Sequence, residues 1–205
     1  IDIAALRTDG TDVVEFGPFE LFPYKDQSIK DLIFKTYDEA RKWNFGGVDP
    51  NLFTLTENKI TQEQSSAIEE FINKYKINKS DIACIGFHGL TVLHRPIDSN
   101  NQFGKTRQLG NGQMMSDYLQ LPVVNNFRSN DIEHGGQGAP LAPIYHLALA
   151  KYIKERNIVF LNIGGVSNIT YVGNNDELVA LDCGPGNAPI DDLVRYHKKG
   201  IMDKD

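Results

Sequence analysis

"TQEQSSAIEEFINKYKINKSDIACIGFHG", residues 61–89, decides the fold class. Apolar residues recur on one helical face of its first part, 61–77, at Ile68, Phe71, Ile72 and Tyr75. We expect an amphipathic helix there. The unbroken apolar run within 81–89, bounded by Asp and Gly, is typical of a strand buried on both faces of a parallel sheet. A helix followed by such a strand predicts a crossover unit and therefore an α/β fold.

The rest of the chain repeats this alternation of strands and helices. Upstream, we expect strands at 1–6 and 12–24 and an amphipathic helix at 28–43. Downstream, the same patterns predict further elements in this order: a helix at 110–120, a strand at 121–127, a helix at 140–156, two strands around a Gly-Gly turn at 157–172 and a last strand and helix within 177–197. No short internal repeat interrupts the series, which favours an α/β domain over a repeat protein.

Composition excludes several classes of protein. The chain has 205 residues, 40% of them hydrophobic, and a net charge of −6, so we expect a folded protein that does not bind nucleic acid. No apolar run approaches the ~20 residues that span a bilayer, and no secretory leader is evident, so we expect no membrane partner. The two cysteines, Cys84 and Cys183, have the pattern of reduced thiols in a cytoplasmic protein.

Polar residues gather where predicted strands end. Ligands of open α/β sheets bind at the carboxyl ends of the strands, and four such ends are followed by polar or glycine-rich stretches. These are "FHG" at 87–89, "NNFRSND" at 125–131, "NIGGVSN" at 162–168 and "DCGPGN" at 182–187. Each stretch alone has an alternative explanation as ordinary turn chemistry. Four at one edge of a sheet favour a binding site.

Two of these stretches have the composition of anion sites. Glycine has no Cβ, so the backbone N–H groups of "IGGVSN" can approach a phosphate closely. "GPGN", 184–187, precedes a predicted helix whose N-terminus would attract an anion. Neither stretch matches the P-loop or the dinucleotide-binding fingerprint.

The segment "HGLTVLHRP", 88–96, predicts a compact polar turn that contains His88, His94 and Arg95. Two histidines without a nearby cysteine or carboxylate do not make a zinc site, so we expect no metal there and instead hydrogen bonds to a polyhydroxylated ligand or a neighbouring loop. Ser167 lacks the context of an activated nucleophile, and Cys84 falls in an apolar run, so covalent catalysis is disfavoured.

Four motifs carry a family resemblance. "FHGLTVLHRP", "LPVVNNFRSNDIEHGGQGAPLAPIYH", "LNIGGVSNIT" and "DCGPGNAPIDDLV" resemble, in this order and spacing, the signatures of the anhydro-N-acetylmuramic acid kinases. The long central motif is the most specific of them. The resemblance implies the actin-like (ribonuclease H-like) ATPase fold, with domain I at 1–156 and the start of domain II at 157–205. It also implies ATP and Mg²⁺ as cofactors and a role in bacterial peptidoglycan recycling.

The resemblance further implies a reaction and a set of site residues. The family opens the 1,6-anhydro ring of anhydro-N-acetylmuramic acid with water and phosphorylates the released 6-oxygen, giving N-acetylmuramic acid 6-phosphate. Asp131 falls at the position of the general base. The expected sugar contacts are His88, Arg95, Arg128, Gly135 and Gly136. The expected nucleotide contacts are Asn162, Gly164, Gly165, Asn168, Asp182, Gly184, Gly186 and Asn187.

The chain also departs from the family pattern. Asn126 stands where the family has an aspartate, and Leu90 stands where it has a glutamine. Ile1 and Asp2 match the end of the family's first phosphate loop, and its adenosine site lies beyond residue 205. We therefore expect domain I to be nearly complete, domain II only begun, and residues 1–205 alone to be inactive unless the missing loop and domain are supplied in cis or by a complementary chain. A homodimer is the other expected partner.

Two other interpretations stay open at this point. One is a degenerate or non-catalytic module that binds the sugar or a complementary chain at most. The other is a different actin-like sugar kinase or regulatory ATPase. Asp131 together with the intact Gly-Gly-Gln-Gly stretch at 135–138 favours the chemistry of the anhydro-N-acetylmuramic acid kinases over this last interpretation.

Overall fold

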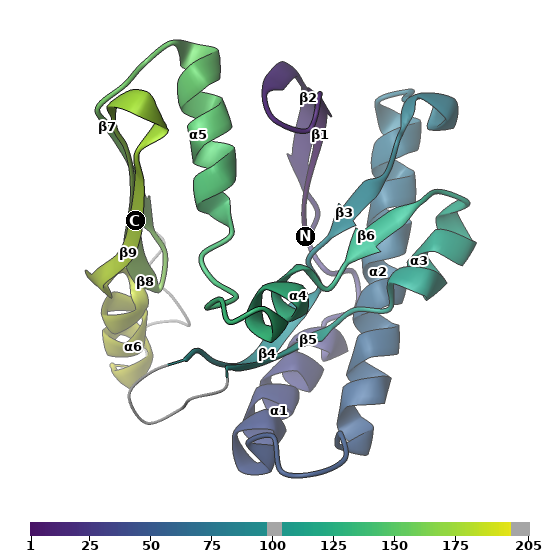
Figure 1. Cartoon of the computed structure of the whole chain (residues 1–205). Coiled ribbons are helices and arrows are strands. Elements are labelled where there is room, and N and C mark those ends of the chain that lie inside the picture. The colour runs from purple at the N-terminus through teal and green to yellow at the C-terminus, as the bar shows by residue number, and fades with distance from the viewer. Residues whose placement is uncertain (98–103, 198–205) are drawn as a thin grey trace. The chain divides into compact units, whose positions relative to one another are not determined.

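The computed structural model describes residues 1–97 and 104–197, which fall into two compact units (Figure 1). Unit 1 comprises Ile1–Ala5 and Gly17–Ala139. Unit 2 comprises Leu6–Phe16 and the chain from Pro140 onward. The fold is mixed α/β, as the sequence predicts. In the described ranges, no helix combines the length and apolar character needed to cross a bilayer.

The predicted helices and strands occur in the predicted order, with further elements between them. Those before Pro140 are β1 (Asp2–Thr8), β2 (Val13–Leu21), α1 (Ser28–Trp43), α2 (Asn51–Lys74), η1 (Lys79–Asp81), β3 (Ile85–Phe87), β4 (Leu90–Arg95), β5 (Lys105–Leu109), α3 (Gly112–Leu119), β6 (Val123–Asn125) and α4 (Phe127–Glu133). Those after it are α5 (Ala142–Ile153), β7 (Ile158–Ile163), β8 (Val166–Val172), η2 (Asn174–Asp176), β9 (Leu178–Pro185) and α6 (Ala188–Tyr196). The tip of the β1–β2 hairpin belongs to unit 2.

Unit 1 contains a crossover unit, but it runs from β3 through α3 rather than through the helix that precedes β3. β3 pairs in parallel with β6, with Gly86 opposite Val124, and α3 lies in the connection between these two strands. β4 and β5 form a separate antiparallel pair with an irregularity between Thr91 and Leu93. Because parallel strands end at the same edge, His88 after β3 and Asn126 after β6 leave the sheet on one side.

The long helix α2 begins at Asn51, ten residues before the predicted start at 61. The pattern missed this part because its buried stripe contains Thr56, a polar residue, between the apolar Phe53 and Ile60. Thr61, the first residue of the predicted helix, is instead fully buried in the middle of α2.

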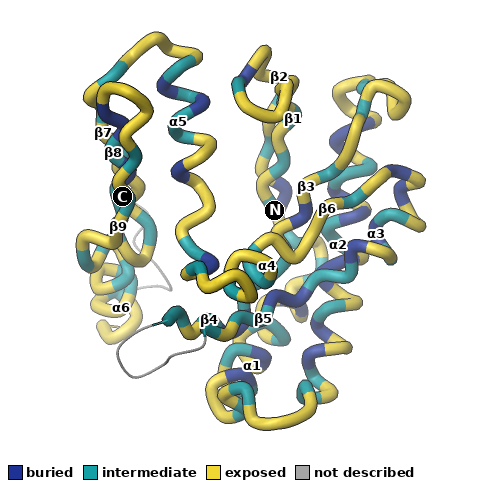
Figure 2. Tube along the Cα trace, in the orientation of Figure 1, coloured by how far each residue is buried: buried dark blue, intermediate teal, exposed yellow. Residues whose placement is uncertain are grey.

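Three apolar clusters form the core of unit 1, and α2 contributes to each. Buried residues recur along α2 in Figure 2. Phe53 and Ile60 pack with α1 and with the β4–β5 pair. Ile72 packs with β3 and α3, whereas Phe71 packs with Phe22 at the base of the hairpin. Within unit 1, a single helix therefore packs against the strands that lead into the polar stretches at 87–89 and 125–131.

Two predictions about 81–96 were wrong in detail. Only Ile85–Phe87 is strand, with Gly86 exposed, and Cys84 is exposed rather than buried in an apolar strand. The predicted polar turn at 88–96 is mostly strand β4, because Val92 and Leu93 enter the core. Its partner β5, "KTRQL", has too few apolar residues to be recognised as a strand.

Unit 2 is a three-stranded antiparallel sheet, β7-β8-β9, with α5 packed against β8 and β9. The Gly-Gly turn predicted between two strands is confirmed as the turn between β7 and β8. Because α5 packs on this sheet, the compact units divide after Ala139, whereas the sequence places the start of domain II at 157.

Candidate functional site

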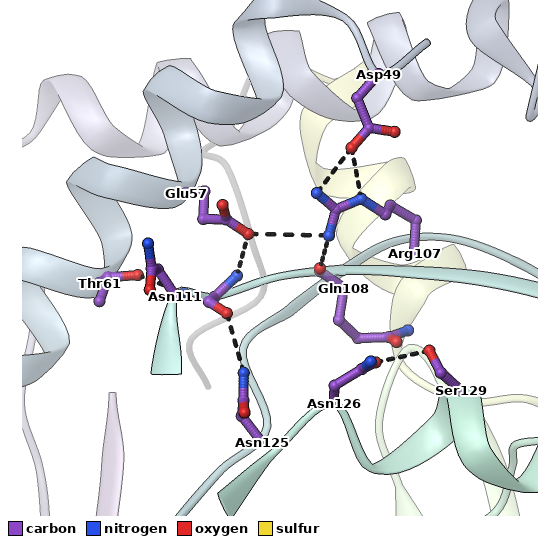
Figure 3. Close-up of polar contacts among 10 residues, drawn as sticks. Asp49, Glu57, Thr61, Arg107, Gln108, Asn111, Asn125, Asn126 and Ser129 are labelled. Carbon is purple, nitrogen blue, oxygen red and sulfur yellow. Dashed lines mark hydrogen bonds and ion pairs between the residues drawn. The ribbon is translucent and has the colours of Figure 1, made fainter. Parts of the chain in front are cut away.

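Helix α4 places Arg128 and Asp131 about one turn apart, at the edge of the sheet where β6 ends. The sequence predicts a strand up to 127 and a polar stretch at 125–131, whereas the strand ends at Asn125 and a short helix follows. It starts from Asn126, whose backbone is left-handed at φ 56° and ψ 44°. The Asn126 side-chain oxygen accepts a hydrogen bond from the Ser129 hydroxyl at 2.7 Å (Figure 3).

The carboxylate of Asp131 is held against the following glycine loop. The Gly138 N–H donates to Asp131 Oδ2 at 2.7 Å, and the Gly136 N–H donates to the Asp131 backbone oxygen at 2.8 Å. A Cβ on Gly136 would lie 2.2 Å from Asp131 Oδ2, so this residue has to be glycine for the carboxylate to lie where it does. Gly135 and Gly138 have positive φ values of 85° and 69°, which glycine adopts without strain.

Arg128 joins this loop to His88. Its Nη1 donates to the Gly138 carbonyl at 2.7 Å, and its Nη2 lies 2.9 Å from His88 Nε2. The other ring nitrogen, Nδ1, is 3.0 Å from the Gly89 carbonyl, which only accepts, so Nδ1 carries the proton and Nε2 accepts from Arg128. Burial lowers the pKa of Arg128 from its ordinary value.

The sequence-predicted residues around the sugar are thus brought together in part. His88, Arg128, Asp131 and Gly136 form one network through Gly138. Gly135 lies in the same loop, and Arg95 is the exposed last residue of β4.

A polar pocket next to this network was not found from the sequence. It has a volume of about 470 Å³ and lies at the N-terminus of α3. It is lined by Glu57, Gly110, Asn111, Gly112, Gln113, Ser116, Val123 and Asn125. The Gly-Asn-Gly stretch at 110–112 was the sequence feature that could have indicated this pocket. In the structure, Asn111 caps α3 by accepting the Met114 N–H.

Side chains of α2 fix the wall of this pocket (Figure 3). Glu57 Oε1 accepts the Gly110 N–H at 3.0 Å, and Thr61 Oγ1 accepts the Asn111 N–H at 3.1 Å. On the other side, Asn125 Nδ2 donates to the Gly110 carbonyl at 3.4 Å. The chain entering α4 is therefore connected to α2 through a turn whose backbone groups are hydrogen bonded.

Arg107 of β5 anchors the same region to the start of α2. Its Nε and Nη2 both lie 2.8 Å from Asp49 Oδ2, and its Nη1 lies 3.8 Å from Glu57 Oε1. Arg107 and Glu57 are mostly shielded from solvent, so these contacts are screened less than surface pairs.

In unit 2, three of the residues expected to bind nucleotide form one row across the sheet. Asn162 of β7 lies opposite Asn168 of β8, and Asn168 lies opposite Asp182 of β9. Side chains directly opposite one another in antiparallel strands point to the same face. One carboxylate and two carboxamides are thus adjacent, next to the Gly164–Gly165 turn.

The two glycine-rich stretches of unit 2 touch each other. The Gly186 N–H donates to the Gly165 carbonyl at 3.0 Å, and the Asn187 N–H donates to the Gly164 carbonyl at 2.8 Å. These two N–H groups are therefore occupied within the protein and brace the β7–β8 turn. A direct contact of Gly184, Gly186 or Asn187 with nucleotide stays a prediction.

Replacing Gly186 by Ala is expected to destabilise unit 2 by about 1–3 kcal/mol, because its Cβ would lie 2.0 Å from the Gly164 carbonyl oxygen, a backbone atom that cannot rotate away. Denaturant unfolding measures the change. Gly165→Ala is the matched control, since its Cβ meets only Ala188 at 3.6 Å. Equal stability of the two variants would contradict the contact between the turns.

A site for Mg²⁺ has to be judged from the donors present. Within residues 1–97 and 104–197, no group of three or more His, Cys, Asp and Glu side chains is arranged to hold a metal ion. Mg²⁺ commonly uses only one or two protein carboxylates and completes its shell with substrate phosphates and water. The carboxylate of Asp182, which lies opposite Asn168, could serve as such a single protein ligand.

Comparison with known proteins agrees with the motifs. A family model described as anhydro-N-acetylmuramic acid kinase matches residues 3–205. The chain is 46% identical to the anhydro-N-acetylmuramic acid kinase of Brucella anthropi, 44% to that of Rhizobium rhizogenes and 41% to that of Agrobacterium fabrum. Each alignment covers 100% of this chain but 54–55% of the relative, so the chain spans about half the length of the curated relatives it matches. The chain belongs to the anhydro-N-acetylmuramic acid kinase family.

Proposed function

We propose that the protein carrying this chain is an ATP-dependent kinase that opens the 1,6-anhydro ring of anhydro-N-acetylmuramic acid and phosphorylates its 6-oxygen. The observation that carries this proposal is the placement of Asp131, whose exposed carboxylate is held by the N–H of Gly138, the residue whose carbonyl accepts from Arg128. Its relatives bear the name of this activity.

The proposed reaction needs one base. Asp131 takes a proton from a water molecule while the water oxygen forms a bond to the anomeric carbon of the sugar. The bond from that carbon to the 6-oxygen breaks, and the 6-oxygen takes the γ-phosphoryl group of ATP as ADP leaves. The products are N-acetylmuramic acid 6-phosphate, ADP and the proton released from water. A positioned base supplies about 10²–10⁴-fold of the rate.

The neighbours of Asp131 suit that role. Arg128 donates to the Gly138 carbonyl and Asp131 accepts the Gly138 N–H, so one residue of the loop holds both side chains. His88 and the Gly138 carbonyl fix the guanidinium, so it does not have to be ordered when sugar binds. The glycines at 135 and 136 let the loop approach the sugar closely.

For the nucleotide, we propose that the Gly164–Gly165 turn and the row of Asn162, Asn168 and Asp182 face the phosphates of ATP. Asp182 would hold Mg²⁺, which neutralises charge on the transferring phosphoryl group when bound. Gly184, Gly186 and Asn187 complete this side of the site. In this proposal the chain has an actin-like fold, with domain I at 1–156 and the start of domain II at 157–205. Domain I carries the sugar site, and the residues named above belong to domain II.

The proposed activity also implies a setting. Its substrate is a fragment of bacterial peptidoglycan, so the reaction would serve the recycling of cell-wall sugar, in the cytoplasm where ATP is available. A homodimer partner or a complementary chain is the proposed protein partner.

Replacing His88, Arg95 or Arg128 by Ala is expected to raise the sugar's dissociation constant by about tenfold or more, since a hydrogen bond to a charged group contributes about 1.5–3 kcal/mol. Calorimetric titration measures the affinity, and thermal unfolding measures stability. Arg41→Ala is the control, because Arg41 pairs with Asp38 on the exposed face of α1. Three variants that lose stability but keep their affinity would show that these loops are only structural.

The proposed function is tested by sugar-dependent ADP release. The protein that contains residues 1–205 is mixed with ATP, Mg²⁺ and anhydro-N-acetylmuramic acid, and the sugar product is identified by mass spectrometry. The expected product is heavier than the substrate by one water and one phosphoryl group. A product that gained the phosphoryl group without water would overturn the hydrolytic role of Asp131, and absence of any sugar phosphate would overturn the kinase.

A further inference from the structure

Two side chains of α2 hold the turn between β5 and α3 (Figure 3). Glu57 Oε1 accepts the Gly110 N–H at 3.0 Å, and Thr61 Oγ1 accepts the Asn111 N–H at 3.1 Å. Glu57 and Thr61 are four positions apart, so they are neighbours on one face of the helix. Two consecutive N–H groups of the turn are therefore bound by the same helix face.

The turn that α2 holds lies against both neighbours of His88. A Cβ on Gly110 would lie 2.9 Å from Phe87 Cζ and 3.1 Å from Gly89 Cα. A Cβ on Gly89 would in turn lie 2.4 Å from the Leu109 carbonyl oxygen, so the two backbones are in direct contact. Phe87 and Gly89 flank His88 in the chain. Because packed groups transmit displacements to one another, a shift of Gly110 reaches the backbone on both sides of His88.

The orientation of the His88 ring depends on that backbone. Its Nδ1–H donates to the Gly89 carbonyl at 3.0 Å, which leaves Nε2 to accept from Arg128 Nη2 at 2.9 Å. The carbonyl that fixes the ring thus belongs to the residue against which Gly110 packs. The contact between His88 and Arg128 is therefore sensitive to where the turn is held.

Glu57 is well suited to hold the turn in place. A backbone N–H that donates to a carboxylate forms a charge-assisted hydrogen bond, which is stronger than a neutral one. The Glu57 side chain is 21% exposed, so water competes little for this contact. Arg107 is fixed by Asp49, and its Nη1 lies 3.8 Å from Glu57 Oε1. The same oxygen therefore faces a fixed cation and the Gly110 N–H.

We propose that Glu57 is a positioning residue for the sugar site. It fixes the Gly110 turn and, through Gly89, the orientation in which the His88 ring accepts from Arg128. Its effect on sugar binding rests on the proposed function, whereas its effect on the His88 ring does not.

Sugar affinity is the first measurement. Glu57→Ala removes the acceptor of the Gly110 N–H, and we expect calorimetric titration to show a five- to tenfold rise, on the order of one lost hydrogen bond, in the dissociation constant of anhydro-N-acetylmuramic acid. Glu57→Gln keeps an acceptor oxygen, so its dissociation constant should stay within about twofold of the wild type. Glu69→Ala is the matched control, because Glu69 accepts the Tyr118 hydroxyl at 2.7 Å on a part of α2 about three helical turns away.

A double variant tests whether Glu57 acts through His88. In a His88→Ala background there is no ring left to orient, so adding Glu57→Ala should change the dissociation constant little further. Thermal unfolding of every variant is the control for folding. Losses that multiply fully, or an affinity that follows the melting temperature in all variants, would overturn the positioning role.

Nuclear magnetic resonance of the ring nitrogens tests the contact without sugar. At a pH where the His88 ring is neutral, the wild type and Glu57→Gln should show the proton on Nδ1. Glu57→Ala should show a mixture of the two neutral tautomers, because the ring is no longer held against one acceptor. Thr61→Val, which removes the other acceptor of the turn, takes its place with the same expectation if Glu57→Ala does not fold.

The ring signals and the sugar assay decide different points. Unchanged ring signals in the folded variant overturn the positioning role, whatever the affinity. The expected ring signals in a protein whose wild type forms no sugar phosphate would leave the role of Glu57 in orienting His88 standing and overturn the proposed function alone.

Discussion

Replacing Asp131 by Asn is expected to lower turnover by at least about 10²-fold while the affinity for the sugar stays close to that of the wild type. The amide oxygen of Asn can still accept the Gly138 N–H that now binds Asp131 Oδ2, so the loop keeps its main contact. What the amide cannot do is take a proton from water. Steady-state kinetics and calorimetric titration of the sugar measure the two quantities separately.

The control for this substitution lies on the same helix. Glu133 is an exposed carboxylate at the end of α4, so Glu133→Gln removes the same charge without touching the glycine loop. We expect its turnover to match that of the wild type. If Asp131 serves only to hold the loop, Asp131→Asn will also keep near-normal turnover, and the assignment of the base is then wrong.

Replacing Gly136 by Ala is expected to have an effect of similar size by a different route. The new Cβ would lie 2.2 Å from Asp131 Oδ2 and 2.4 Å from its Cγ, so the carboxylate has to rotate away and leave the Gly138 N–H. Because the obstructing group is a rotatable side chain, the fold should survive. We expect turnover to fall about 10²-fold, as for other displacements of a catalytic group by an ångström.

Gly135→Ala provides the contrast. Its Cβ would meet nothing within 4 Å, but its φ of 85° is strained for any residue with a side chain and costs about 1–2 kcal/mol. We therefore expect Gly135→Ala to lose more stability and Gly136→Ala to lose more turnover, as measured by denaturant unfolding and kinetics. The opposite order would show that Asp131 does not need its present place.

A double variant tests whether the two effects share one cause. If Gly136→Ala acts only by displacing the Asp131 carboxylate, then adding it to Asp131→Asn should lower turnover little further, since the base is already absent. Fully multiplicative losses would assign Gly136 a separate contact with substrate.

The sequence alone was sufficient to predict the elements that depend on residues within one short segment. The apolar periodicity of 28–43 predicts α1 with the same bounds that the structure has, because helix period and core-facing side chains are both written within one segment. The Gly-Gly pair between two apolar runs predicts the β7–β8 turn for the same reason. The four motifs identified the family, and the long central one at 121–146 identified the candidate base, since the residues of each motif are close together in sequence.

Local patterns were misleading where burial depends on distant partners. Thr56 and Thr61 look polar in the sequence, yet both are buried, because Thr56 meets Thr36 of α1 and Thr61 receives the Asn111 N–H. The polar strand β5 exists because β4 pairs with it. A polar side chain is recognised as interior only after its partner is known.

The sequence by itself determined the fold class, the order of most elements, the family and the residue proposed as base. Only the tertiary structure decided how these residues are held. Glu57 and Thr61 bind backbone groups that lie 53 and 50 positions further along the chain. The path of the backbone likewise decides that Gly136 lies close to Asp131 and that Gly186 lies close to Gly164. Backbone N–H and C=O groups are the same at nearly every residue, so the sequence carries no mark of which of them will meet.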